Sequence, residues 1–447
     1  MTHWLYQYQK YQYQKDYGLF MLKKALIFFF AGLLLFALAS FILYQFRSRP
    51  PQLSEDPSVY LQPDEISTIQ VAASETARPS TYLNAAEIAT IRARVKAQDE
   101  PWKTAYDRMI SEANQALSQG PYSLTYNGGS SDSGGAKFET QLPYCGWTAV
   151  DGQKPDCRDG KTNPDADRQD YEQAIALGKA VSTLGLAYQF VSEDQDTNQY
   201  AEKALSLIRT WCIDAETRMS PHFTNNQSRI ELSVSLPGLL YGADLIDDYT
   251  DWPSAEKAQF ETWVRRMAQS ALSWHKPNNF ENWRVHLIAL AGSLLKDESL
   301  LNYAFGRYKE MIPLQMDETG RMTQELNRTT SLNYSLYALN AMTQTAELAK
   351  HQGVDLYDYT TDDGIGLKRS LDYHAQFATS KTPDNWPYQQ ISPLEADQNV
   401  ALYEMAYAHW REPAYLAVIN YWGRPMTERR VHWNITLTHA SQMEGET

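Results

Sequence analysis

The sequence has little of what nucleic-acid or metal binding requires. Its 447 residues include 40 basic and 54 acidic side chains, a formal net charge of −14. A surface that binds phosphate backbones needs an excess of Lys and Arg, so we expect no nucleic-acid partner. The three cysteines form no CxxC pair, and no tight cluster of His and Asp is present. Glycine-rich phosphate and dinucleotide fingerprints are missing too, and we expect neither a metal nor another cofactor.

The sequence has no strand run convincing enough to form a large sheet, and no internal repeat is obvious. From Tyr82 onward, apolar residues recur at three- and four-residue spacing, which predicts helices. Asn84 caps the first helix and Glu100-Pro101 starts the second. The other helices are expected near residues 168–192, 197–212, 229–249, 254–274, 281–296, 298–312, 330–351, 364–379, 395–410 and 413–421. A dozen helices with short connectors predict an all-α domain over residues 81–447, an incomplete (α/α) toroid of helical hairpins. A solenoid is the alternative, but its repeat signature is absent.

One long apolar run stands near the N-terminus. Ala25–Tyr44 holds twenty uncharged residues, about 30 Å of helix, which is the hydrocarbon thickness of a bilayer. More basic residues precede the run than follow it, so residues 1–24 are expected in the cytoplasm and the body in the periplasm, anchored to the inner membrane. A signal peptide cleaved near Ala37-Leu38-Ala39 is the alternative, and either segment exports the body. Met21 is a second possible start, so no structure is assigned to residues 1–20.

Charge is divided unevenly along the chain. The first 50 residues carry six basic side chains and one acidic one, which leaves 34 basic and 53 acidic residues for the remainder. Residues 45–80 are rich in Pro, Ser and acids and are typical of a linker. An acidic body repels a polyanion over most of its surface. Binding of one would therefore be confined to a cleft with local cations and would be sensitive to salt.

The stretch 125–165 is long and rich in Gly, Ser and Asp, which inside a compact domain indicates a functional loop. Within it, Cys145 and Cys157 are candidates to close a short disulfide loop in an oxidising compartment. Cys212 lies in an apolar helical pattern, and we expect it in the core.

Aromatic residues are dense, with 12 Trp, 29 Tyr and 14 Phe. Several stand beside polar residues, as in PYCGW (143–147), NNFENW (278–283), NWPY (385–388) and RVHWN (430–434). Aromatic faces next to amides and guanidinium groups suit sugar rings, so Tyr144, Trp147 and Trp283 are candidate sugar contacts. Packing in the core is the alternative for each single residue.

Three segments combine such residues with helix starts. CRDGKTNPD (157–165) leads into a helix, KPNNFENWRVH (276–286) introduces another, and QELNRTTSLNYSLYAL (324–339) holds cap residues followed by Tyr334. An ideal helix would separate Arg328 and Tyr334 by about 120°. Their cooperation therefore requires Arg328 to precede the regular helix.

Together these segments resemble the alginate lyase family of helical polysaccharide lyases. The resemblance rests on RDGKTNP (158–164), RTWCIDAETRMSPHFTNNQ (209–227), NN (278–279) and ELNRTTSLNY (325–334), in that order, and extends over roughly residues 80–410. It implies an incomplete α/α toroid with a long open cleft, an anionic uronate polysaccharide as substrate, and no cofactor. Asn278 and Arg158, inside these motifs, are candidate substrate contacts.

The resemblance also implies the reaction, a β-elimination. Removal of H5 next to the C6 carboxylate expels the 4-O-linked sugar, and amide and cationic groups must hold that carboxylate and spread the enolate charge. Asn279 and Arg328 are the candidates. A base must take H5 and an acid must protonate O4; Tyr334, which matches the catalytic Tyr of the family, can serve both steps where H5 and O4 share a face, as in mannuronate or glucuronate. We expect the Arg328 guanidinium to favour the phenolate of Tyr334.

The sequence departs from the family pattern at one position. The family places a histidine directly after the Asn pair, and this chain has Phe280 there. His286, on the same predicted helix face as Asn279 and Trp283, is one candidate substitute, and His222 is another. Phe280 itself is a candidate for stacking on a sugar.

Two other functions stay open. A carbohydrate-binding relative without catalytic activity is favoured by the loss of the histidine at Phe280. A toroidal glycoside hydrolase needs two carboxylates across the cleft, for which Glu325, Asp159 and Glu395 are available.

Overall fold

The structure is a computed structural model that describes residues 78–127, 131–132, 135–147, 157–191, 197–430 and 434–441. The apolar run 25–44, the N-terminal segment 1–24 and nearly all of the linker lie outside these residues. Among the residues described, no helix is both long and apolar enough to cross a membrane. The membrane segment therefore stays a prediction from the sequence.

The first two helices begin where their capping residues predict. Asn84 Oδ1 accepts the N–H of Glu87, and the Glu87 carboxylate accepts the N–H of Asn84, a capping box that starts α2 (Ala85–Lys96). The Glu100-Pro101 pair precedes α3 (Trp102–Ala116), whose buried side chains recur every three or four residues. Both predicted starts are confirmed.

The other predicted helices are also present, with ends shifted by a few residues. They are α4 (Gln169–Phe190), α5 (Asn198–Ile208), α6 (Asn226–Leu245), α7 (Ser254–Leu272), α8 (Asn279–Leu295), α9 (Glu298–Gln315), α10 (Ser331–His351), α11 (Leu367–Ala375), α12 (Leu402–Trp410) and α13 (Pro413–Trp422). Short π-helical turns stand next to two of them, η3 (Arg209–Ile213) after α5 and η4 (Ala396–Val400) before α12. The mostly helical fold is thus confirmed.

The helices pack as successive hairpins. In the series α4, α6, α8, α10 and α12, each helix contacts the next, while α5, α9, α11 and α13 pack against α4, α8, α10 and α12 respectively. Helices α4, α6 and α8 are buried along most of their length. The core therefore runs between the two sets of helices.

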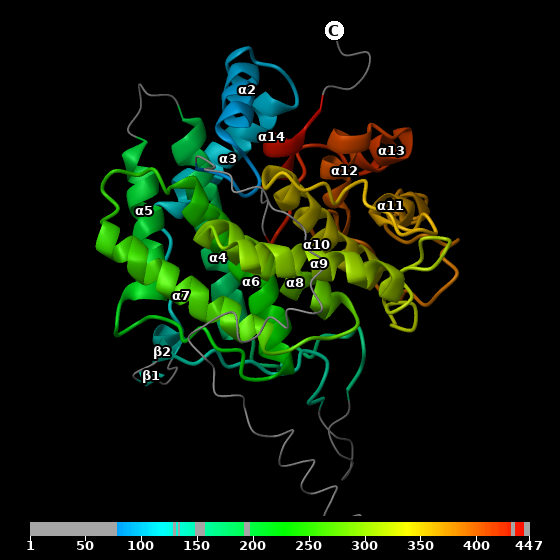
Figure 1. The fold of residues 1–447 in the computed structure, drawn as a ribbon, viewed down its shortest axis with the longest axis horizontal. Coiled ribbons are helices and arrows are strands. Elements are labelled where there is room, and N and C mark those ends of the chain that lie inside the picture. The colour runs from blue at the N-terminus through cyan, green and yellow to red at the C-terminus, as the bar shows by residue number, and fades with distance from the viewer. Residues whose placement is uncertain are drawn as a thin grey trace, which may run out of the picture. The chain divides into compact units, whose positions relative to one another are not determined.

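A short helix that the sequence did not predict joins the two ends of this series. Helix α14 (Ile435–His439) contacts both α12 and α3, and Figure 1 shows it beside α2 and α3, which lie at the other end of the chain. Five residues are too few to show a helical period, which is why the pattern of apolar residues missed it.

A small hairpin anchors the long loop before α4. Strands β1 (Ser131–Asp132) and β2 (Gly135–Ala136) pair antiparallel, and Ala136 also exchanges backbone hydrogen bonds with the segment after η3. Gly135 has φ +109°, and a Cβ there would lie 2.7 Å from the carbonyl oxygen of Arg218. A side chain does not fit at this contact, so the position requires glycine.

Candidate active site

The first turn of α8 and the start of α10 bring the main predicted residues to one cleft of about 480 Å³. Asn279 and Phe280 line it from α8, and Arg328 and Tyr334 line it from the other side. Helix α10 begins at Ser331, so Arg328 precedes the regular helix as its cooperation with Tyr334 requires. Asn278 is the N-cap of α8, where its Oδ1 accepts the N–H of Phe280. Asn278 is not among the described residues that line the cleft, and its predicted substrate contact stays a prediction beside this capping role.

Arg328 is held on the face of the Tyr334 ring. Its guanidinium carbon lies 3.6 Å from the ring centroid. The same guanidinium donates two hydrogen bonds to Asp159, with distances to Oδ1 of 2.5 Å from Nη2 and 3.1 Å from Nε. Asp159 also accepts the N–H of Thr329. Burial acts to raise the pKa of Asp159, but the hydrogen bonds from Arg328 and Thr329 outweigh it and lower that pKa. The aspartate is thus ionised, and it fixes Arg328 in place.

The environment of Tyr334 favours the neutral phenol. Burial and the neighbouring Tyr144 raise the pKa of Tyr334 well above its ordinary value, although Arg328 acts to lower it. Arg328 therefore acts in the predicted direction, towards the phenolate, but its effect is outweighed. The cation is present, but desolvation of the hydroxyl is the larger effect.

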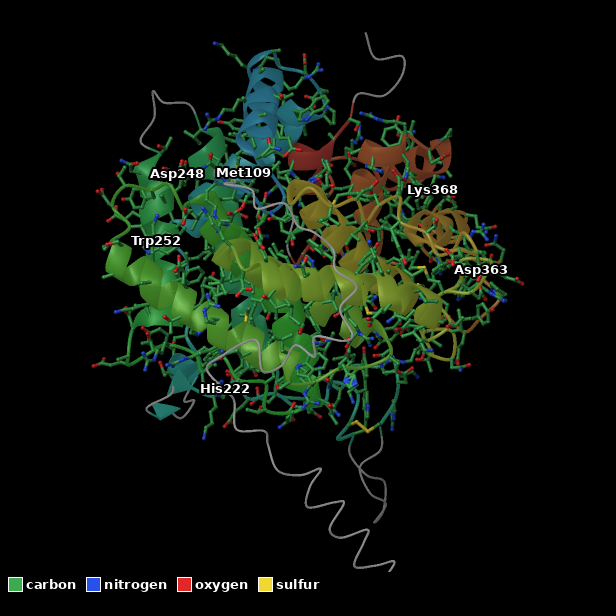
Figure 2. The ribbon with its side chains drawn as sticks, viewed as in Figure 1. Met109, His222, Asp248, Trp252, Asp363 and Lys368 are labelled. Atoms are coloured by element: carbon green, nitrogen blue, oxygen red, sulfur yellow. A yellow bond between two sulfur atoms is a disulfide. The ribbon has the colours of Figure 1, made fainter. Side chains whose placement is uncertain are left out.

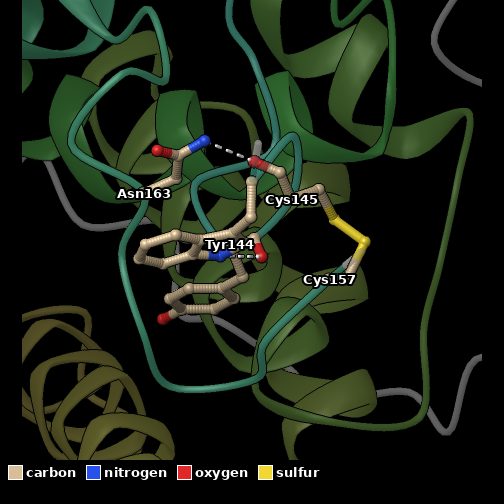
Figure 3. Close-up of a disulfide and its surroundings, with 5 residues drawn as sticks. Tyr144, Cys145, Cys157 and Asn163 are labelled. Atoms are coloured by element: carbon tan, nitrogen blue, oxygen red, sulfur yellow. Dashed lines mark hydrogen bonds between the residues drawn. A yellow bond between two sulfur atoms is a disulfide. The ribbon is translucent and has the colours of Figure 1, made fainter. Parts of the chain in front are cut away.

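A disulfide-bonded loop places Tyr144 and Asp159 in contact with Tyr334 and Arg328. Cys145 and Cys157, the candidate pair, form a disulfide with Cα atoms 4.0 Å apart, and Figure 3 shows Tyr144 beside it. The Tyr144 hydroxyl lies 2.7 Å from the Tyr334 hydroxyl, and Asp159 follows Cys157 by two positions. The disulfide therefore joins the two chain segments that contact Tyr334 and Arg328. Cys212 is buried, as expected.

Two other loop residues contact each other instead of the cleft. The Arg158 guanidinium carbon lies 4.5 Å from the Trp147 ring centroid, and the Trp147 indole N–H donates to the carbonyl of Tyr144. Neither Trp147 nor Arg158 belongs to the described residues that line the cleft. Both side chains are at least partly exposed, and their predicted sugar contacts stay predictions.

Trp283 and His286 are core residues, which corrects two predictions. Both are 0% exposed; His286 Nε2 lies 2.8 Å from the Tyr82 hydroxyl, and Trp283 packs on Tyr337 with ring centroids 5.1 Å apart. Burial lowers the pKa of His286 to about 3. They share a helix face with Asn279 as predicted, but the cleft reaches only the first turn of α8, and the later turns are covered by α10 and neighbouring helices.

His222 is also displaced from the site. Figure 2 shows it beside the β1–β2 hairpin, and it is exposed in the segment between η3 and α6. It does not line the cleft. Neither candidate substitute for the family histidine therefore stands at the reacting groups, and Phe280, half-buried, keeps the position on the cleft wall.

A buried carboxyl group supports Asn279. Glu325 Oε1 accepts both the backbone N–H of Asn279 at 2.8 Å and its side-chain Nδ2 at 2.9 Å. The positions of the carboxylates also concern the glycoside hydrolase alternative, which needs two carboxylates across the cleft. Glu325 is 0% exposed, and Asp159 is bound to Arg328. Of the three carboxylates available to a hydrolase, Glu395 is the one exposed on the cleft wall.

The sequence missed the cations that make the cleft suitable for a polyanion. Beside Arg328, the described lining includes Arg168, Arg429 and Arg430, against the carboxylates of Glu231 and Glu395. Arg430 lies over Tyr337, 4.6 Å from its ring centroid. The RVHWN cluster that begins at Arg430 was the available signal. Each of the four arginines is paired with a carboxylate, Arg328 with Asp159, Arg168 with Glu231, Arg429 with Glu395 and Arg430 with Glu428, so the wall offers guanidinium groups without a large excess of positive charge.

One group of side chains has the spacing of metal ligands but already holds a cation. Glu87, Glu347 and His351 place ligand atoms within 4.8 Å of one another, outside the cleft. The Lys350 ammonium lies 3.0 Å from Glu347 and 3.7 Å from Glu87. These residues form an ion-pair network between α2 and α10, and a divalent ion would have to displace the lysine.

Comparison with known families places the chain among alginate lyases. A family model described as alginate lyase matches residues 106–386. No curated protein matches the sequence significantly.

Solved structures share the fold at low sequence identity. An alginate lyase from Bacteroides ovatus superposes with a TM-score of 0.70 and 22% identity, covering 82% of this chain and 100% of that one. Two variants of alginate lyase A1-III, an enzyme from Sphingomonas species A1, are each complexed with a tetrasaccharide. The histidine-to-alanine variant gives a TM-score of 0.62 at 19% identity, and the tyrosine-to-phenylalanine variant 0.60 at 20%; each comparison covers 81% of this chain and 96% of that one.

Proposed function

The chain belongs to the alginate lyase family of polysaccharide lyases, and we propose that it cleaves a 4-linked uronate polymer of the mannuronate or glucuronate type by β-elimination. The observation that carries the proposal is the arrangement of Tyr334, Arg328 and Asn279 in one cleft lined by arginines. We also infer that the hairpins form the incomplete α/α toroid of this family.

Tyr334 serves as acid and base in the proposed reaction. Tyr334 first loses its phenol proton to solvent, which the neighbouring Arg328 cation favours and burial opposes. The phenolate then takes H5, and the C4–C5 double bond forms as the C4–O4 bond breaks. The proton gained from C5 goes to O4, which regenerates the phenolate. The raised pKa of Tyr334 supports the acid step, because the neutral phenol is the stable form. Arg328 and Asn279 stabilise the C6 carboxylate as it takes on enolate charge.

Phe280 limits the reaction to one stereochemistry. The histidine and the tyrosine replaced in the two A1-III variants are separated by as many positions as Phe280 and Tyr334 are here. This supports the assignment of Phe280 to the histidine position. Without a second base across the sugar ring, elimination requires H5 and O4 on the face of Tyr334, as in mannuronate or glucuronate.

We further propose that the body acts in the periplasm. The apolar run 25–44 carries this proposal, and the disulfide between Cys145 and Cys157 supports it because such bonds persist in oxidising compartments. Fractionation of cells that express the full chain, with and without residues 1–44, tests it. A body that stays in the cytoplasm with reduced cysteines contradicts it.

An absorbance assay tests the activity. The full-length protein is incubated with polymannuronate, polyguluronate, glucuronan and glycosaminoglycans while the absorbance of unsaturated uronate is followed. We expect it to rise with polymannuronate or glucuronan and to stay flat with polyguluronate. New reducing ends without that absorbance would indicate hydrolysis. Binding without either signal would indicate the carbohydrate binder that Phe280 leaves open.

A further inference from the structure

The buried carboxyl group of Glu325 has no part in the reaction as proposed so far. It is 0% exposed, and it stands three positions before Arg328 in the segment between α9 and α10. Its Oε2 has no hydrogen-bond partner among the residues that the structure describes. Burying a carboxyl group with one oxygen unpaired costs free energy. The contacts of its other oxygen must therefore account for the buried position of Glu325.

Those contacts are both with Asn279. A backbone N–H can only donate, so Oε1 is the acceptor of the 2.8 Å bond from the Asn279 main chain. The second contact to the same oxygen, 2.9 Å, must then come from Nδ2, because Oδ1 in that place would set two acceptors against each other. Glu325 therefore determines which end of the Asn279 amide points to it.

The rest of the amide is left for the cleft. Asn279 is 1% exposed and lines the cleft, and its Oδ1 has no partner among the described residues. With one Nδ2 hydrogen bound to Glu325, the second Nδ2 hydrogen and Oδ1 are the groups that remain. Asn279 is also the first residue of α8, where backbone N–H groups have no partner within the helix. Glu325 accepts a hydrogen bond from one of these groups, the N–H of Asn279.

We propose that Glu325 is a positioning residue, which holds the Asn279 amide so that its second Nδ2 hydrogen meets the substrate carboxylate. This rests on the proposed function, because that function supplies the carboxylate. Glu325 itself is covered and acts through Asn279. The segment between α9 and α10 carries both Glu325 and Arg328. It therefore positions Arg328 directly and Asn279 through Glu325, and these are the two groups that stabilise the enolate charge.

The surroundings of Glu325 agree with this role. Burial raises its pKa, although the two N–H bonds from Asn279 act to lower it. Oε1 accepts both N–H bonds whether the group is ionised or carries a proton on Oε2, so the orientation of Asn279 does not depend on the charge of Glu325.

Three substitutions in the full-length protein separate positioning from mere stability. Glu325→Gln keeps an acceptor oxygen, and we expect kcat within about threefold of the wild type. Glu325→Asp withdraws the oxygen by one methylene, and we expect a kcat loss of roughly tenfold. Glu325→Ala removes the acceptor, and we expect about a hundredfold loss of kcat with KM changed less than threefold, since misplacement of a group by about 1 Å has effects of that order.

Glu347→Gln is the matched control, because Glu347 is a buried carboxyl group outside the cleft. It should lower Tm and leave kcat unchanged. A folded Glu325→Ala protein with wild-type kcat overturns the proposal. If that variant does not fold, an unchanged kcat in Glu325→Asp overturns it equally.

A second measurement does not depend on turnover. In full-length protein labelled with ¹⁵N-asparagine, the Asn279 side-chain signals are identified by their loss in Asn279→Ser. We expect one Nδ2 proton to exchange slowly in the wild type and in Glu325→Gln, and rapidly in Glu325→Ala. Equal exchange in all three refutes the positioning role. A wild type that releases no unsaturated product refutes the proposed function instead, and the exchange experiment still decides this inference.

Discussion

Replacement of Tyr334 by phenylalanine tests the centre of the proposed mechanism. The change removes one hydroxyl oxygen and leaves the ring that packs beneath Arg328, 3.6 Å from the guanidinium carbon. Tyr334 donates and accepts the only proton in the proposed elimination, so the variant should bind substrate but fail to turn it over.

The structure sets the size of both effects. General acid–base catalysis by a placed side chain contributes about 10²–10⁴-fold, and Tyr334 serves two steps, so we expect kcat to fall by at least about 10³-fold. The hydroxyl has one hydrogen bond among the described contacts, to Tyr144 at 2.7 Å. Its loss costs about 1 kcal/mol of stability, a decrease in Tm of roughly 2 °C.

The assay follows unsaturated uronate by absorbance, with Tm and oligosaccharide affinity measured on the same samples. Tyr144→Phe is the matched control: it breaks the same hydrogen bond and leaves the Tyr334 hydroxyl, so its rate should fall by less than about tenfold. A Tyr334→Phe protein that keeps more than a tenth of the wild-type rate would refute the mechanism. So would a Tyr144→Phe protein that loses as much as the Tyr334 variant.

Three further predictions concern the loop, the core histidine and the cleft charge. Reduction of the Cys145–Cys157 disulfide, or Cys145→Ser with Cys157→Ser, should lower the free energy of unfolding by about 3 kcal/mol. It should also lower kcat, because Tyr144 and Asp159 flank the bridge. Denaturant unfolding measures the first effect and the absorbance assay the second. His286 has a lowered pKa of about 3, so the stability it gives is present above its unfolded pKa of about 6.5 and is lost as pH falls towards 3, about 2 kcal/mol by pH 5; His286→Gln should remove this slope from unfolding measured against pH. Raising NaCl from about 50 to 500 mM should raise KM for the polymer on the order of tenfold and leave kcat nearly constant.

Each of these has a contrary result. An unchanged kcat in the reduced protein would show that other contacts hold the loop in place. Parallel stability curves for the wild type and His286→Gln between pH 7 and 5 would mean that His286 binds its proton equally well in the folded and unfolded states, so that folding does not lower its pKa. A KM independent of salt would mean that the cleft arginines do not bind the polymer.

The sequence was informative wherever neighbouring residues decide the outcome. Helix periods and caps such as Asn84 were correct because they depend on a few consecutive residues. The requirement that Arg328 precede α10 came from helix geometry alone, and the structure agrees. The family resemblance rested on short motifs in order, and all four lie within the residues that the family model matches.

Errors arose where the answer depended on what covers a residue. Trp283 and His286 lie on the same helix face as Asn279, but helical phase does not say how deep a cleft reaches. His222 has the right chemistry and stands in the wrong part of the fold. Arg168 and Arg430 line the cleft from distant segments; Arg168 carried no local signal of this position, and the RVHWN cluster was the one signal for Arg430.

The sequence by itself thus determined the helical architecture, the family and the pair Tyr334 and Arg328, because local periodicity and short motifs encode them. Tertiary structure alone decided the electrostatics of the site. The Asp159–Arg328 pair spans two distant segments, and so does the contact between Glu325 and Asn279. Burial, which raises the pKa of Tyr334 against the effect of Arg328, exists only once the chain has folded around it.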